Sequence, residues 1–73
     1  MEEEAKRLWE LYSSDAEWEP YDHVDDFCWA CSIGLEIDGF VFEGEGQIIG
    51  GSDDNEIEYI DCTCPDGTVV KIV

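Results

Sequence analysis

The first fourteen residues carry apolar side chains at helical spacing. Four of them recur at i, i+3, i+4 and i+7 and so share one helical face: Ala5, Leu8, Trp9 and Tyr12. Leu11 widens this apolar stripe. Three consecutive glutamates, Glu2 to Glu4, would lie at the positive end of the helix dipole, where acids stabilise. The pattern predicts a helix over residues 2–14.

From residue 27 the pattern changes to a period of two, in which apolar positions alternate with small or polar ones as far as Ile37. Asp38-Gly39 follows, a dipeptide favoured in two-residue hairpin turns, and a second strand would run from Phe40 to Ile49. Such a turn fixes the register of the hairpin. The expected pairs are Ile37–Phe40, Leu35–Phe42, Ile33–Gly44, Cys31–Gly46 and Trp29–Ile48.

Two more strands are expected after a polar loop, over residues 56–64 and 68–73. The three residues between them, Pro65-Asp66-Gly67, are typical of a turn with glycine in the left-handed conformation. This loop length pairs Cys62 with Val70 and places Asp61 opposite Lys71, a favourable cross-strand pair.

Residues 15–26 are interpreted as a connector, because they are rich in charge and contain Pro20, which disfavours helix at the preceding residue. The expected fold class is therefore α+β: one N-terminal helix packed on a four-stranded antiparallel β-meander, in a single domain of residues 1–73. In the expected core, helix residues pack on one face of the sheet. The helix residues are Leu8, Trp9 and Tyr12, and the sheet residues are Trp29, Ile33, Leu35, Phe42, Ile60 and Ile72.

Charge changes this picture from a generic small domain to an unusual one. Twenty acidic residues against three basic ones give a net charge of −17. Ordinary solubility of a small domain needs a magnitude of about 2–8. Direct binding to nucleic acid or to an anionic membrane is excluded on electrostatic grounds. Adaptation to high salt is an alternative explanation of this charge. The composition of seven isoleucines and only three alanines argues against it, because it is not expected of a halophile with a GC-rich genome.

The N-terminal sequence Met1-Glu2-Glu3-Glu4 lacks the basic and apolar regions of a signal peptide. No apolar run approaches the roughly 20 residues that span a bilayer. We therefore expect a cytoplasmic location, in which cysteines stay reduced unless a metal holds them.

The four cysteines raise the alternative of a zinc-stabilised structural or adaptor domain, with ligands Cys28, Cys31, Cys62 and Cys64. The strand assignment argues against it, because Cys28 and Cys31 would point to opposite faces. Cys31 and Cys62 would also lie two inter-strand steps apart, roughly 9.6 Å. Buried free thiols without a metal or other cofactor are the preferred interpretation.

Candidate catalytic groups do not form a recognisable set. His23 is the single histidine and has no motif spacing to Cys28, so we expect a solvated side chain and no enzymatic activity. The acidic segment around Asp53 and Asp54 lacks the spacing and central glycine of a calcium loop.

Many carboxylates should remain exposed on this fold and form a partner-binding surface. The expected members are Glu36, Glu43 and Glu45 on the sheet face opposite the helix, Asp53, Asp54, Glu56 and Glu58 around the second loop, and Asp22, Asp25 and Asp26 before the first strand. Val41, Ile49, Tyr59, Val69 and Val73 share that outer face, with Trp18 and Tyr21 covering part of it. An apolar centre within an acidic rim is typical of an interface.

In size, in its dispersed Asp and Glu residues and in its helix-plus-meander pattern, the chain resembles the small acidic phage-encoded proteins that block bacterial defence enzymes, the anti-CRISPR and anti-restriction DNA mimics. The resemblance implies an inhibitor in the host bacterial cytoplasm. Its partner would be a basic, nucleic-acid-binding surface, such as that of a CRISPR effector or another DNA-binding defence protein. We expect the chain to act as a monomer or as a homodimer.

Overall fold

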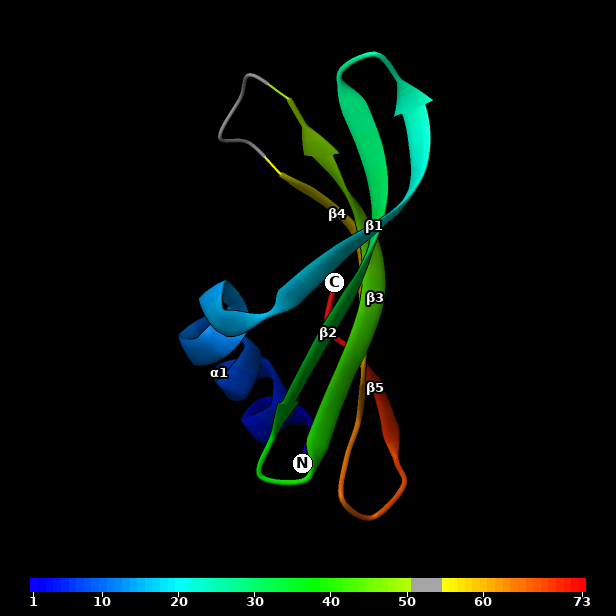
Figure 1. Ribbon diagram of the computed structural model, residues 1–73. Helices are drawn as coiled ribbons and strands as arrows, with labels where there is room; N and C mark the ends of the chain where they lie inside the picture. The colour runs from blue at the N-terminus through cyan, green and yellow to red at the C-terminus, as the bar shows by residue number, and fades with distance from the viewer. Residues whose placement is uncertain (51–54) are drawn as a thin grey trace.

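The computed structural model describes residues 1–50 and 55–73. Its elements are α1 (Glu2–Tyr12), a 3-10 turn (Ser13–Asp15), β1 (Glu17–Asp25), β2 (Cys28–Ile37), β3 (Phe40–Ile49), β4 (Glu56–Thr63) and β5 (Val69–Lys71). The strands form one antiparallel sheet in the order β1-β2-β3-β4-β5, and α1 lies against one face of it (Figure 1). The α+β class and the N-terminal helix are therefore as expected.

The expected number of strands was wrong, because the segment predicted as a connector is strand β1. Glu17 pairs with Gly34 and Pro20 pairs with Cys31, after which the register shifts twice before Asp25 pairs with Cys28. Two bulges and a proline remove the period-2 pattern by which a strand is recognised, although Pro20 is tolerated at the edge of a sheet.

The predicted hairpins are confirmed in register, although β5 spans three residues where residues 68–73 were expected. All five expected pairs between β2 and β3 are present in the register. Asp38 and Gly39 both have positive φ, 51° and 83°, as a type I′ turn requires. Cys62 pairs with Val70 and Asp61 with Lys71, as expected for β4 and β5. Gly67 has a φ of 90°, which confirms the left-handed glycine of the last turn.

The core lies between α1 and the adjacent half of the sheet. Trp9 of α1 meets Phe42 of β3 with ring centroids 5.5 Å apart. The buried members of this cluster are Ala5, Leu8, Trp9, Ile33, Phe40, Phe42, Ile60, Cys62, Cys64 and Val70. The helix is shorter than predicted, and Tyr12 and Leu11 near its end are 41% and 62% exposed, so the expected core position of Tyr12 was wrong.

Two tryptophans differ from their expected places. Trp18 of β1 pairs with Ile33 and packs against the core cluster, so it lies on the helix side and not over the outer face. Trp29 lies farther along the sheet, where its ring stacks on His23 of β1 at a centroid distance of 5.3 Å. His23 is exposed, as predicted, but it belongs to a strand.

Gly46 shows why the sheet needs a residue without a side chain opposite these rings. A Cβ at Gly46 would lie 2.8 Å from the Trp18 ring and 3.0 Å from the Ile33 Cδ1 atom. The glycine therefore admits Trp18 to the core.

Candidate functional site

The sheet face opposite α1 is built from the alternate residues of every strand. In one row across the sheet the register gives Glu17, Gly34, Glu43, Asp61 and Lys71. In the next row it gives Glu19, Ser32, Glu45 and Tyr59. Because side chains alternate between the faces of a strand, the carboxylates of these rows point to the same side. We call this surface the carboxylate face; its acids are Glu17, Glu19, Asp22, Glu36, Glu43, Glu45, Glu56 and Asp61.

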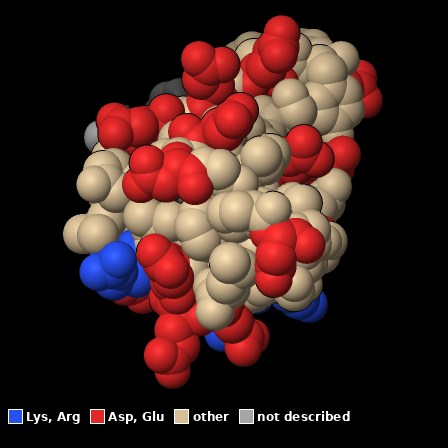
Figure 2. Space-filling model, turned by 90° about the horizontal axis from the view of Figure 1, so that it is seen from below, with Lys and Arg blue, Asp and Glu red and all other residues tan. Residues whose placement is uncertain are grey.

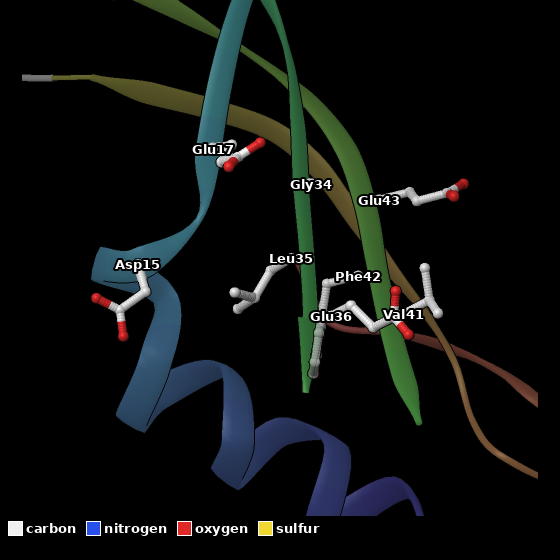
Figure 3. A pocket seen from close by; sticks show the side chains of 8 residues that line it. All are labelled: Asp15, Glu17, Gly34, Leu35, Glu36, Val41, Phe42 and Glu43. Carbon is white, nitrogen blue, oxygen red and sulfur yellow. The ribbon is translucent and has the colours of Figure 1, made fainter. Parts of the chain in front are cut away.

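The centre of the carboxylate face is hollow, because β2 contributes small residues there. Gly34 of β2 lies between Glu17 of β1 and Glu43 of β3 (Figure 3). Two adjoining depressions of about 440 and 390 Å³ share these three residues. Tyr59 lines the second depression. The carboxylates of β1 (Glu17 and Glu19) and those of β3 (Glu43 and Glu45) thus flank a shallow trough. These two walls are two strands apart, a separation of about 9.6 Å.

One of the three basic residues, Lys71, lies on this face, whereas Lys6 and Arg7 belong to α1 on the other side of the sheet. Lys6 lies 3.7 Å from Glu2 within α1, and Lys71 is on the short strand β5 opposite Asp61. Figure 2 shows the resulting surface at one end of the molecule, where acidic side chains are spread widely and basic ones sit at the edges. On the carboxylate face itself, Glu43 lies directly opposite Asp61, a like-charge pair that costs stability.

The pKa values of Tyr21 and Cys28 are both raised, in part by acids that come from different strands. The pKa of Tyr21 is raised by partial desolvation, then by the charge and hydrogen bond of Glu45, and further by Glu58 and Asp22. The pKa of Cys28 is raised by desolvation and then by Asp25 and Glu56. The fold therefore brings together acids of β1, β3 and β4 that are distant in the sequence.

The predicted site residues fall into distinct groups. Glu36, Glu43 and Glu45 lie on the face opposite the helix, as expected. Glu56 joins them through its pairing with Gln47, and Glu58 lies at the β4 bulge. Asp53 and Asp54 lie outside the described residues.

The three aspartates placed before the first strand belong to β1 and its turn instead. Asp22 accepts a hydrogen bond from the His23 backbone N–H at 2.9 Å. Asp25 accepts one from the Phe27 N–H at 2.9 Å, so part of its role is to fix the turn. Asp26 is an exposed turn residue.

The sequence interpretation missed Glu17 and Glu19, which form one wall of the trough. They were assigned to the connector. The available signal was the alternation Glu17, Trp18, Glu19, in which a lone aromatic residue separates two acids.

The four cysteines are buried, as expected. Cys28 donates to the Gln47 side-chain oxygen at 3.2 Å, and burial followed by the neighbouring Cys64 raises the pKa of Cys62 to about 11. Such thiols are protonated and weakly nucleophilic at neutral pH. Within residues 1–50 and 55–73, no three His, Cys, Asp or Glu side chains come together as a metal-binding group.

No family model, curated protein or solved structure matches this chain. In the part of the chain that the structure describes, no helix is both long and apolar enough to cross a membrane.

Proposed function

We propose that this chain is an acidic inhibitor that binds the basic, nucleic-acid-binding surface of a bacterial defence nuclease complex, such as a CRISPR effector, in the host cytoplasm. The observation that supports the proposal is the carboxylate face. There, acids of four strands project from one sheet, and the one basic residue on that face, Lys71, lies on the edge strand β5.

The physical mechanism is the substitution of carboxylates for phosphates. Surfaces that bind nucleic acid present Lys and Arg, whose contacts with phosphates release condensed counterions. Carboxylates held in rows by a sheet can occupy the same cations without the conformational cost that a disordered acidic tail would incur. A net charge of −17 also steers the encounter with a basic partner.

Exposed apolar groups beside the acids would lengthen the lifetime of such a complex. Tyr59 lies within the carboxylate face and is 41% exposed, and Val69 at the edge of the sheet is 64% exposed. Aromatic and aliphatic contacts of this kind commonly supply the slow dissociation of a complex whose association is electrostatic.

The test is inhibition of DNA cleavage by a panel of CRISPR effectors and restriction nucleases, measured with increasing DNA and salt. We expect this chain to inhibit at least one of the enzymes. The inhibition should be competitive with DNA and weaker at high ionic strength. The double variant Glu43→Gln/Glu45→Gln should inhibit about tenfold less well, since two charge-assisted contacts are lost.

The matched control is Glu3→Gln/Glu10→Gln on α1, which removes the same charge far from the carboxylate face. It should inhibit as well as the wild type. Equal losses in both variants, or a complex that binds DNA and this protein together, would contradict the proposal.

A further inference from the structure

Strand β1 forms the longer open edge of the described sheet. It spans nine residues and pairs with β2, whereas β5 at the opposite edge spans three. Apart from the half-buried Trp18, every residue of β1 is exposed. An edge of this kind presents backbone groups that have no partner strand, and it is a potential docking site.

The register shows which backbone groups point away from the sheet. In a two-residue hairpin the residues that flank the turn, here Ile37 and Phe40, form a hydrogen-bonded pair. Along β2 the peptide groups alternate in direction, so those of Ser32 and Gly34 point toward β1. Their partners Glu19 and Glu17 therefore point inward, and Trp18 and Pro20 point outward. In agreement, the Ser32 hydroxyl donates to the Glu19 carbonyl oxygen at 3.5 Å.

This outward row is poor in hydrogen-bond donors. Pro20 has no N–H, and the N–H of His23, the next outward residue of the ladder, is bonded to the Asp22 carboxylate at 2.9 Å. Trp18 supplies a donor, while Trp18, Pro20 and His23 all supply carbonyl oxygens. The edge is therefore an array of acceptors beside the acids of β1.

An edge of acceptors is badly suited to strand addition. An added antiparallel strand needs donors and acceptors in alternation, and the two bulges of β1 interrupt the register further. A second copy of this chain would also bring acids opposite acids, which is destabilising. A side chain with several N–H groups and a positive charge meets neither obstacle.

We propose that the β1 edge binds arginine side chains of the basic partner, through the outward carbonyl oxygens of Trp18 and Pro20 together with the Glu17 and Glu19 carboxylates, and does not accept a β-strand. This inference rests on the proposed function, because it specifies the chemistry of the partner at one margin of the carboxylate face. Arginine is favoured over lysine since its planar group carries five N–H donors in a fixed fork, which can bridge a carbonyl and a carboxylate.

The experiment is carbonyl carbon NMR of the isotope-labelled full chain, titrated with octa-arginine and with octa-lysine peptides of equal charge. We expect octa-arginine to bind at least about threefold more tightly. The carbonyl signals of Trp18 and Pro20 should move more than those of the inward-pointing Glu17 and Glu19. Equal movement of inward and outward carbonyls would overturn the inference, as would absence of binding or regular strand-type contacts along β1.

Glu19→Gln and Glu10→Gln provide a matched pair, because each removes one negative charge from an exposed position and Glu10 lies on α1. Affinity for octa-arginine should fall about threefold to tenfold in Glu19→Gln and stay unchanged in Glu10→Gln. Equal losses in the two would show general attraction to a polyanion and overturn the edge site.

Failure of this inference is distinguishable from failure of the proposed function. Shifts confined to Glu43 and Glu45, with β1 unaffected, would remove the edge site and leave the carboxylate face as a binding surface. Arginine binding at β1 without inhibition of any nuclease would retain the edge site and contradict the proposed function.

Discussion

The two faces of the sheet use the same strands for opposite purposes. Toward α1, β3 presents Phe40 and Phe42, which are 5% and 0% exposed, and the two glycines Gly44 and Gly46. Toward solvent the intervening residues include Glu43 and Glu45. The first face is determined by shape and the second by charge, although their residues alternate one by one along the chain.

The two faces of the sheet should therefore tolerate different substitutions. Changes on the helix side alter packing and are expected to unfold the domain, because a 73-residue chain has a small core and a narrow stability margin. Changes on the carboxylate face relieve repulsion and are expected to leave the fold intact while they weaken binding. Paired variants from the two faces of one strand test this separation directly.

The largest expected contrast is between Phe42→Ala and Val41→Ala. Phe42 is fully buried against Trp9, so its truncation should lower the free energy of unfolding by about 3–5 kcal/mol. Val41 is half-buried on the other face, and its truncation should cost about 1 kcal/mol or less. Urea unfolding followed by tryptophan fluorescence measures both. Similar losses in the two variants would mean that the outer face is part of the core.

The second contrast uses two glycines of opposite faces. A Cβ at Gly44 would collide with the Tyr59 carbonyl oxygen and lie 2.7 Å from the Ile60 Cδ1 atom, whereas a Cβ at Gly34 meets nothing within 4 Å. Gly44→Ala should therefore destabilise by about 1–3 kcal/mol. Gly34→Ala should stabilise by about 0.5–1 kcal/mol, since alanine loses less backbone entropy than glycine in a strand.

Thermal unfolding of both alanine variants gives the sign of each effect. A destabilised Gly34→Ala would show that the floor of the trough is packed in solution, contrary to the open hollow described above. An unchanged Gly44→Ala would show that β3 and β4 separate easily at this point.

The sequence predicted these two faces from β2 onward because the decisive information is local. Asp38-Gly39 sets the turn, the turn sets the register, and the register assigns every residue of β2 and β3 to a face. Glu36, Glu43 and Glu45 were placed correctly for this reason. The left-handed Gly67 gave the same certainty for β4 and β5.

Strand β1 was not predicted because its sequence shows no sustained alternation of apolar and polar residues. Its alternation is broken by bulges around Tyr21 and Val24, and Pro20 lies within it. An exposed edge strand buries little apolar surface, so its side chains carry no strong periodic signal. Glu17 and Glu19 were missed with it, and so the trough between β1 and β3 was not predicted.

A third contrast compares one charge change in two regions. Glu43→Gln removes the like-charge pair with Asp61 and should raise the free energy of unfolding by about 0.2–1 kcal/mol at low ionic strength. Glu3→Gln removes an acid from the first turn of α1 and should lower it by about 0.3–1 kcal/mol, because the helix dipole favours that charge. Urea titrations with and without 1 M NaCl should show both effects and their loss by screening. Two effects of the same sign would indicate that total charge, and not position, governs stability.

The smallest effect, and the most local one, concerns the titration of Tyr21. The pKa of this phenol lies above the ordinary tyrosine value of 10.0 because of partial desolvation and then Glu45. A raised pKa of an acid means that the neutral form is favoured in the folded state. The associated stability is present below pH 10.0 and is lost as the pH rises from there toward the folded value.

Glu45→Gln should lower the pKa of Tyr21 toward its ordinary value without reaching it, because desolvation, the larger cause, remains. Carbon NMR of the tyrosine rings across alkaline pH resolves this residue from Tyr12 and Tyr59. Glu36→Gln is the control: it removes an equal charge from the same face, but Glu36 is not among the groups that raise the pKa of Tyr21. If Glu36→Gln lowered that pKa as much as Glu45→Gln, the carboxylates would act through their total charge and not through their individual positions. A shift confined to Glu45→Gln would instead show that the sheet holds them in fixed places, which is the property that a rigid substitute for phosphates requires.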